Sequence, residues 1–316
     1  MFWRSVAIRL WCPTIGALAA FAVLPAIIEL VGLGELERVR LLGERVDQLI
    51  DSQDDAGAIL LVGNSVAIEG LDAERVREAA GAEQPVRNYA INGSRLPETA
   101  AMLPRLLQTR PSAVVFVLMP THLVETREAT PDEDAAYAMS GLVDSDLTGA
   151  EAITHFRTAP LRSLDDRLRM QLASGRRSGA AADWSCPNLL TADAPPVARE
   201  NHLARVRELL TADRSDGELR DRIALIERMA ADCERAGAAF LLCEAPIHPA
   251  LRDDAVDLAG FDPPTDSLRF VDLLAEAEFA DAVHPNAAGR IRFSEAMGAS
   301  LGRLRQSGTV RLAGGE

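Results

Sequence analysis

Three residues of this chain belong to types that together make a serine nucleophilic: Ser65, Asp281 and His284. Ser65 follows Gly63 and Asn64 directly after an apolar run, so that its hydroxyl and its own amide can meet where a helix starts. His284 is the natural base for the Ser65 proton, and Asp281, one loop turn away, can orient the imidazole and stabilise its charged form. Each residue alone is more typical of a helix cap or turn than of a catalytic site. Their order and positions together favour acyl transfer through a serine ester.

The elements that must position these residues alternate between apolar runs and amphipathic segments. Strands are predicted at Ala58–Val62, Val86–Tyr89, Ala113–Leu118 and Ala238–Cys243, with a short apolar stretch at Leu268–Leu273. Helices are predicted at Glu35–Gln53, Leu71–Ala80, Pro97–Gln108, Asp216–Ala236 and Ala287–Leu304. Apolar strands separated by helices indicate an α/β fold with a doubly wound parallel sheet. Ligands of such sheets bind beyond the carboxyl ends of the strands, where the three candidate residues are expected.

The composition excludes several function classes. The 316 residues contain 33 basic side chains, all of them Arg, against 47 acidic ones, giving a net charge of −14. Without Lys there is no Walker-type phosphate loop and no Schiff-base chemistry. The acidic balance is the reverse of what a nucleic-acid partner requires. The spacing of Cys and His forms no zinc motif, so we expect neither a metal nor a cofactor.

The first residues predict a membrane anchor. Trp11–Leu33 carries a single charge, Glu29, and is long enough to cross a bilayer as a helix. Arg4 and Arg9 favour a cytoplasmic N-terminus, which places the rest of the chain on the periplasmic or extracellular side as a single-pass protein of the cytoplasmic membrane. A cleaved signal peptide is the alternative, since Gly16–Ala22 offers small residues.

The predicted organisation is therefore an anchor at 1–34, a linker helix at 35–54, a catalytic domain at 55–307 and a disordered tail at 308–316. Residues 123–215 interrupt the alternation, and we expect a mostly helical insertion there, either a lid or partner surface or a solvated elaboration without a role.

Three segments resemble the SGNH (GDSL-like) hydrolases. AILLVGNSVAIEG is similar to the first block of that family, with Ser65 at the nucleophile and Asn64 where Asp is usual. NYAINGSRLPET is similar to the second block and places Gly93 at the glycine whose amide contributes to the oxyanion hole. FADAVHPNAAGRIRFSEAM is similar to the fifth block, with Asp281 and His284 as its paired residues. The resemblance implies a flavodoxin-like sheet and an oxyanion hole formed by the Ser65 and Gly93 amides.

The third block departs from the family. Where the family has Gly-x-Asn-Asp, this strand ends Leu118-Met119-Pro120-Thr121-His122, so Thr121 falls at the position of the oxyanion asparagine. Thr121 or His122 could replace that donor; for His122 a loop role is about equally expected.

Other polar or reactive residues near the predicted site have simpler structural explanations. Asn92 and His248 are expected in turns, and Cys243 in the core. Cys233 could pair with Cys243 in an exported domain.

With its predicted anchor and altered third block, the chain resembles anchored, exported members of the superfamily. These members act in bacterial polysaccharide and cell-envelope acylation, such as alginate acetylation proteins. That resemblance implies a serine esterase or O-acyltransferase acting on acyl esters of a glycan, with a membrane-bound acyltransferase as a partner. The alternative is a catalytically silent carbohydrate-binding or scaffold subunit that keeps the fold without a working third block.

Overall fold

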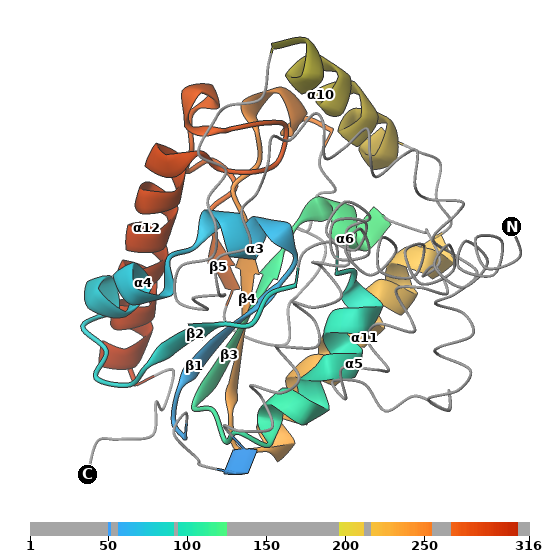
Figure 1. The fold of residues 1–316 in the computed structure, drawn as a ribbon. Helices are drawn as coiled ribbons and strands as arrows, with labels where there is room; N and C mark the ends of the chain where they lie inside the picture. Colours follow the sequence, from blue (N-terminus) through green and yellow to red (C-terminus); the bar gives the residue numbers. More distant parts are fainter. Residues whose placement is uncertain are drawn as a thin grey trace, which may run out of the picture.

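The computed structural model describes residues 50–51, 56–91, 94–124, 196–211, 216–254 and 267–308. These residues form an α/β fold in which five parallel strands make one sheet with helices on both faces (Figure 1). The strands are β1 Ile59–Gly63, β2 Val86–Asn88, β3 Ala113–Leu118, β4 Ala239–Glu244 and β5 Ser267–Arg269. The helices are α3 Ser65–Gly70, α4 Ala73–Ala80, α5 Leu96–Leu107, α6 Pro120–Val124, α10 Pro196–Thr211, α11 Asp216–Arg235 and α12 Ala287–Gln306, with short 3-10 turns η1 Pro249–Leu251 and η3 Glu276–Glu278.

The strand order is β2-β1-β3-β4-β5. The chain therefore runs from β1 outward to β2 and then returns to the other side of β1 for β3, so that the order reverses between β1 and β3. The registers Gly63 with Val117 and Leu118 with Glu244 bring the carboxyl ends of the three central strands to one edge. Such a reversal is where ligands of open α/β sheets bind.

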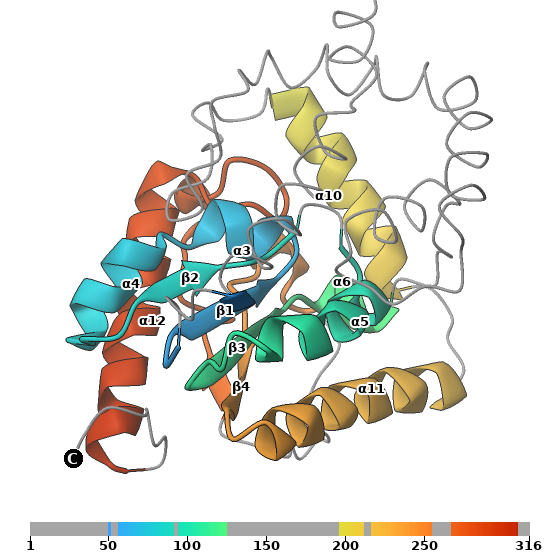
Figure 2. The ribbon, with the colours of Figure 1, turned by 60° about the horizontal axis from the view of Figure 1, so that its bottom comes forward.

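Alternating side chains of the strands feed two separate cores. In β3, Val114, Phe116 and Leu118 enter the core shared with α5 and α11, whereas Ala113, Val115 and Val117 enter the core shared with α4 and α12. Figure 2 shows these two helix pairs on opposite sides of the sheet. Because both faces are covered, the strands are apolar throughout rather than alternating, as parallel sheets require.

Close packing of α12 on α4 fixes the start of α12, which immediately follows the His284 loop. A Cβ atom at Gly298 would lie 2.5 Å from the Val76 carbonyl oxygen, so the absent side chain lets the two helices touch. The Ser294 hydroxyl accepts the Asp72 amide (2.9 Å) and donates to the Arg290 carbonyl (2.7 Å). The helix after the His284 loop is thus tied to the first βα unit.

The predicted α/β fold and parallel sheet are confirmed, with small changes at the boundaries. Strand β2 ends at Asn88 rather than Tyr89, and α4 begins at Ala73 because the Asp72 side chain caps it. The apolar stretch after residue 267 is a short edge strand whose central residue, Leu268, is buried.

Several predictions concern residues that the structure does not describe. The anchor at Trp11–Leu33, most of the linker helix at 35–54 and the tail from 309 onward lie outside the described ranges, as does most of 123–215. Within the described ranges, no helix combines the length and apolar character needed to cross a membrane.

Candidate active site

Ser65 is the first residue of α3, directly after the turn that leaves β1. Gly63 makes this turn with φ of +147°, and a Cβ atom there would lie 2.9 Å from the Val117 carbonyl oxygen. Only glycine meets both demands, because L side chains avoid this backbone region. The Asn64 side chain then caps α3 by accepting the Val66 amide (3.0 Å). Asn64 therefore serves as a helix cap at the position where the resembling family has Asp.

The Asp281–Asn286 segment holds the other two candidates in a tight loop before α12. Asp281 Oδ1 accepts the amides of Val283 (2.9 Å) and His284 (2.8 Å), which fixes the carboxylate to its own loop. The His284 carbonyl accepts the Ala280 amide (2.8 Å) and closes the loop from the other side. Asn286 caps α12 through Ala288 and Gly289.

The structure brings Ser65, His284 and Asp281 into one hydrogen-bonded chain. His284 Nε2 lies 2.8 Å from Ser65 Oγ, and His284 Nδ1 lies 2.8 Å from Asp281 Oδ2. An ionised carboxylate only accepts, so Nδ1 carries the proton and Nε2 is left to accept the Ser65 hydroxyl. This is the tautomer in which imidazole can act as a base toward serine.

The electrostatics of Asp281 suit this arrangement. Burial alone would raise the pKa of Asp281, but the hydrogen bond and charge of His284, with the amides of Val283 and His284, bring that pKa below its ordinary value. The Asp281 carboxylate is therefore ionised at neutral pH and can accept the proton on His284 Nδ1. The side chains of Asp281 and His284 are 18% and 17% exposed, so both are largely buried but still reach solvent.

The segment after β2 is tied to the Ser65 turn. The Gly63 carbonyl accepts both the Ile91 amide (3.0 Å) and the Ser94 hydroxyl (2.9 Å). Asn92 and Gly93 lie between these two contacts but outside the described residues, so the predicted Gly93 oxyanion donor stays a prediction. These contacts hold both ends of this segment beside the Gly63–Ser65 turn.

Thr121 and His122 lie in α6, which follows β3. Thr121 is half-buried, whereas His122 is only 2% exposed and its Nδ1 accepts the Met119 amide at 3.0 Å. Nε2 of His122 therefore carries the proton, and this buried atom has no hydrogen-bond partner among the described residues. Burial lowers the pKa of His122 to about 4, while the Ser94 carbonyl acts in the opposite direction. His122 is thus a neutral N–H donor beside the Ser94 backbone.

The remaining sequence candidates have structural roles. His248 Nδ1 accepts the Ala250 amide (3.2 Å) to cap η1, and its ring packs on Phe279 with centroids 5.1 Å apart. Cys233 and Cys243 are buried free thiols rather than a disulfide. Burial raises the pKa of Cys233 to about 12, which leaves this thiol unreactive.

Sequence reasoning missed one residue of this site, His202 in α10. Its Nδ1 lies 3.7 Å from Asp281 Oδ2, the same oxygen that accepts His284. No pattern in the sequence connects a histidine in the middle of a separate helix with this loop; only the packing of α10 does so.

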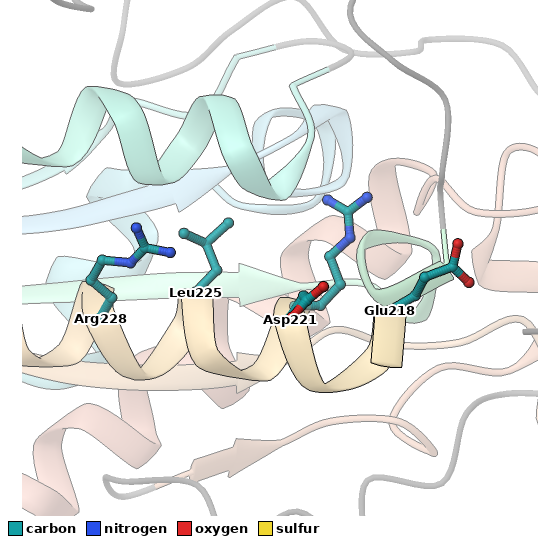
Figure 3. Close-up of a pocket in the computed structure, with 5 residues that line it drawn as sticks. Glu218, Asp221, Leu225 and Arg228 are labelled. Atoms are coloured by element: carbon teal, nitrogen blue, oxygen red, sulfur yellow. The ribbon is translucent and has the colours of Figure 1, made fainter. Parts of the chain in front are cut away.

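A hollow in the described structure is lined by Glu218, Asp221, Arg222, Leu225 and Arg228. Figure 3 shows Glu218, Asp221, Leu225 and Arg228 along α11. None of Ser65, Asp281 and His284 lines this hollow. The hollow does not share the chemistry of the Ser65 site. Within the described part of the chain, no three His, Cys, Asp or Glu residues are grouped to hold a metal ion.

In comparisons with known proteins, no family model and no curated protein sequence matches this chain. The assignment of a function therefore depends on the geometry of the Ser65 site.

Proposed function

We propose that this protein is a serine acyl-ester hydrolase or O-acyltransferase of the SGNH type. The observation that carries the proposal is the chain of two 2.8 Å contacts from Ser65 through His284 to Asp281. The strand order 2-1-3-4-5 is the flavodoxin-like order of doubly wound sheets, and Ser65 follows the strand beside its switch point. Both features agree with the family that the three sequence blocks resemble.

In the proposed reaction, Ser65 Oγ attacks the acyl carbonyl carbon while His284 Nε2 takes the hydroxyl proton. The negative charge on the carbonyl oxygen is stabilised by the Ser65 amide, which donates to no described residue, and by the Gly93 amide that the resemblance supplies. Collapse breaks the bond to the alkoxy group, which leaves with the proton from His284. Water or a sugar hydroxyl then attacks the acyl-Ser65 ester and gives its proton to His284. The bond between the acyl carbon and Ser65 Oγ breaks, Oγ takes the proton back from His284, and the carboxylic acid or the acylated sugar is released.

The acceptor and the setting are part of the proposal. The resemblance to exported acylation proteins favours an envelope or extracellular glycan as substrate and a membrane-bound acyltransferase as partner. The apolar run Trp11–Leu33 favours an N-terminal anchor at residues 1–34. A catalytically silent subunit is the second candidate, and the Thr121 departure from the third block is the feature that favours it.

Hydrolysis of p-nitrophenyl acetate by the full chain tests the proposal. The wild type should release p-nitrophenol, and Ser65→Ala should reduce kcat by on the order of 10⁴–10⁶ while the protein keeps its thermal melt. A sugar acceptor added to the same assay distinguishes transfer from hydrolysis by the acetylated sugar it yields. Activity that survives Ser65→Ala would contradict this mechanism.

A further inference from the structure

Asp281 Oδ2 is approached by two imidazoles, but only one of them is within hydrogen-bond distance. His284 Nδ1 lies 2.8 Å away and His202 Nδ1 lies 3.7 Å away. Oδ1 of the same carboxylate already accepts two backbone amides. A carboxylate oxygen accepts two hydrogen bonds, so Oδ2 retains capacity for one further donor.

Contacts along α10 hold His202 beside this oxygen. Arg199, one turn before His202, donates to the Ala280 carbonyl at 3.4 Å. Arg207, after His202, pairs with Asp254 (2.8 Å) and donates to the Ala250 carbonyl (2.6 Å). Figure 1 shows α10 at the same end of the sheet as α3 and α6.

Apolar side chains of α10 also pack into the core of the protein. Val206 and Leu210 are buried in the core that also contains α5 and α11. Because α10 is attached to the rest of the protein on both sides of His202, the second imidazole is kept beside Asp281.

We propose that His202 is a positioning residue for the catalytic base: its Nδ1–H becomes the second donor to Asp281 Oδ2 and thereby holds the carboxylate that orients His284. The inference rests on the proposed function and gives α10 a role in it. A closure of about 0.7 Å would bring Nδ1 to hydrogen-bond distance, and catalytic hydrogen bonds are often long before substrate binds.

The protonation state of His202 suits a neutral donor. Burial lowers the pKa of His202, while the Asp281 charge opposes this effect and His284 and Arg205 reinforce it. A neutral imidazole can donate to Asp281 without placing a second positive charge beside His284. The titratable and charged groups on α10 are Arg199, Glu200, Arg205, Arg207 and Glu208. Those on the elements packed against it are Asp281 and His284 on the loop, His248, Arg252, Asp253 and Asp254 around η1, and His122 on α6.

The test uses the full chain and compares His202→Leu, which removes the donor, with His202→Asn, which places an amide nitrogen near the position of Nδ1. Loss of one weak hydrogen bond should lower kcat in His202→Leu by roughly three- to tenfold with little change in KM. Without the second donor, the negative charge of Asp281 is stabilised by fewer hydrogen bonds and attracts the positive charge of protonated His284 more strongly. The acid limb of kcat/KM should therefore move to higher pH. His202→Asn should restore both the rate and the pH profile.

A second readout does not require activity. The NMR resonance of the proton on His284 Nδ1 should move downfield in His202→Leu, because the remaining hydrogen bond to Asp281 shortens, and should stay in place in His202→Asn. Asn201→Leu, an exposed change on the same helix, is the matched control and should alter neither readout. His202→Ala removes the same donor and replaces His202→Leu if the latter lowers Tm.

The possible outcomes separate this inference from the proposed function. If the wild type is inactive but the His284 resonance still moves in His202→Leu, the proposed function is contradicted, whereas the interaction of His202 with Asp281 and His284 is supported. An active wild type in which His202→Leu and Asn201→Leu share one pH profile and one His284 resonance would overturn the role of His202.

Discussion

His284 Nε2 lies 2.8 Å from Ser65 Oγ, although the two residues are 219 positions apart in the sequence. One stands on the turn after β1 and the other on the loop before α12, so their contact depends on the packing of α12 against α4. The hydrogen bond from the Asp72 amide to the Ser294 hydroxyl ties these two helices together near the site. The geometry of the site is therefore a property of the whole sheet face rather than of either loop.

The three linked residues should behave as one unit in kinetics. Ser65→Ala and His284→Ala should lose about the same activity, and the double variant should be no worse than either single one. Asp281→Asn should be milder, because the base remains and only its tautomer and orientation suffer. Ester hydrolysis by each variant, with thermal melts as the folding control, measures this order. Additive losses in the double variant would mean that the residues act independently.

Gly63→Ala should reduce both stability and activity. The Ala side chain would meet the Val117 carbonyl and strain a backbone of φ +147°, which together should cost about 2–4 kcal/mol of unfolding free energy. Gly237→Ala is the matched control: its φ is +77°, but nothing lies within 4 Å of the added carbon. That variant should cost about 1–2 kcal/mol, from backbone strain alone, and leave catalysis intact. Equal unfolding free energies for both variants in urea would contradict the steric account.

Much of this fold could be predicted from the sequence because its strands are apolar on both faces. The run Ala113–Leu118 coincides with β3 as observed, since a continuous apolar segment of that length fits a covered parallel strand. Ser65 and His284 could be placed at one edge because that edge collects the residues that follow each strand.

Other features could not be predicted because they arise from packing. The tautomer of His122 follows from the Met119 amide, which the sequence does not reveal. The approach of His202 to Asp281 depends on how α10 docks, and the periodicity of a helix says nothing about which loop it meets.

The burial of His122 predicts a pH dependence of stability. The pKa of His122 falls from 6.5 to about 4 on folding, so below pH 6.5 the unfolded chain takes up a proton that the folded protein excludes. This residue should therefore lower the free energy of unfolding by about 2 kcal/mol between pH 7.5 and pH 5. His122→Asn, whose side-chain oxygen can accept the Met119 amide, should lose that part of the slope. Urea unfolding of both proteins at the two pH values gives the change in unfolding free energy between pH 7.5 and pH 5. An equal change in both proteins would show that His122 does not contribute.

Thr121→Asn should raise turnover on an activated ester. Thr121 stands where the resembling family has an oxyanion donor, and one such donor can change kcat by about 10²–10³. Thr121→Val keeps the shape of the side chain without its hydroxyl and should lower turnover only if that hydroxyl already donates. Unchanged turnover in both variants would show that this position does not face the oxyanion.

Covalent labelling by a fluorophosphonate tests whether Ser65 is an activated nucleophile, because the probe reacts with a serine only when a neighbouring base activates it. The full-length wild type should be labelled at one site, identified as Ser65 by peptide mass spectrometry, and both Ser65→Ala and His284→Ala should remain unlabelled. A folded wild type that resists the probe, or equal labelling after His284→Ala, would contradict the activation of Ser65 by His284.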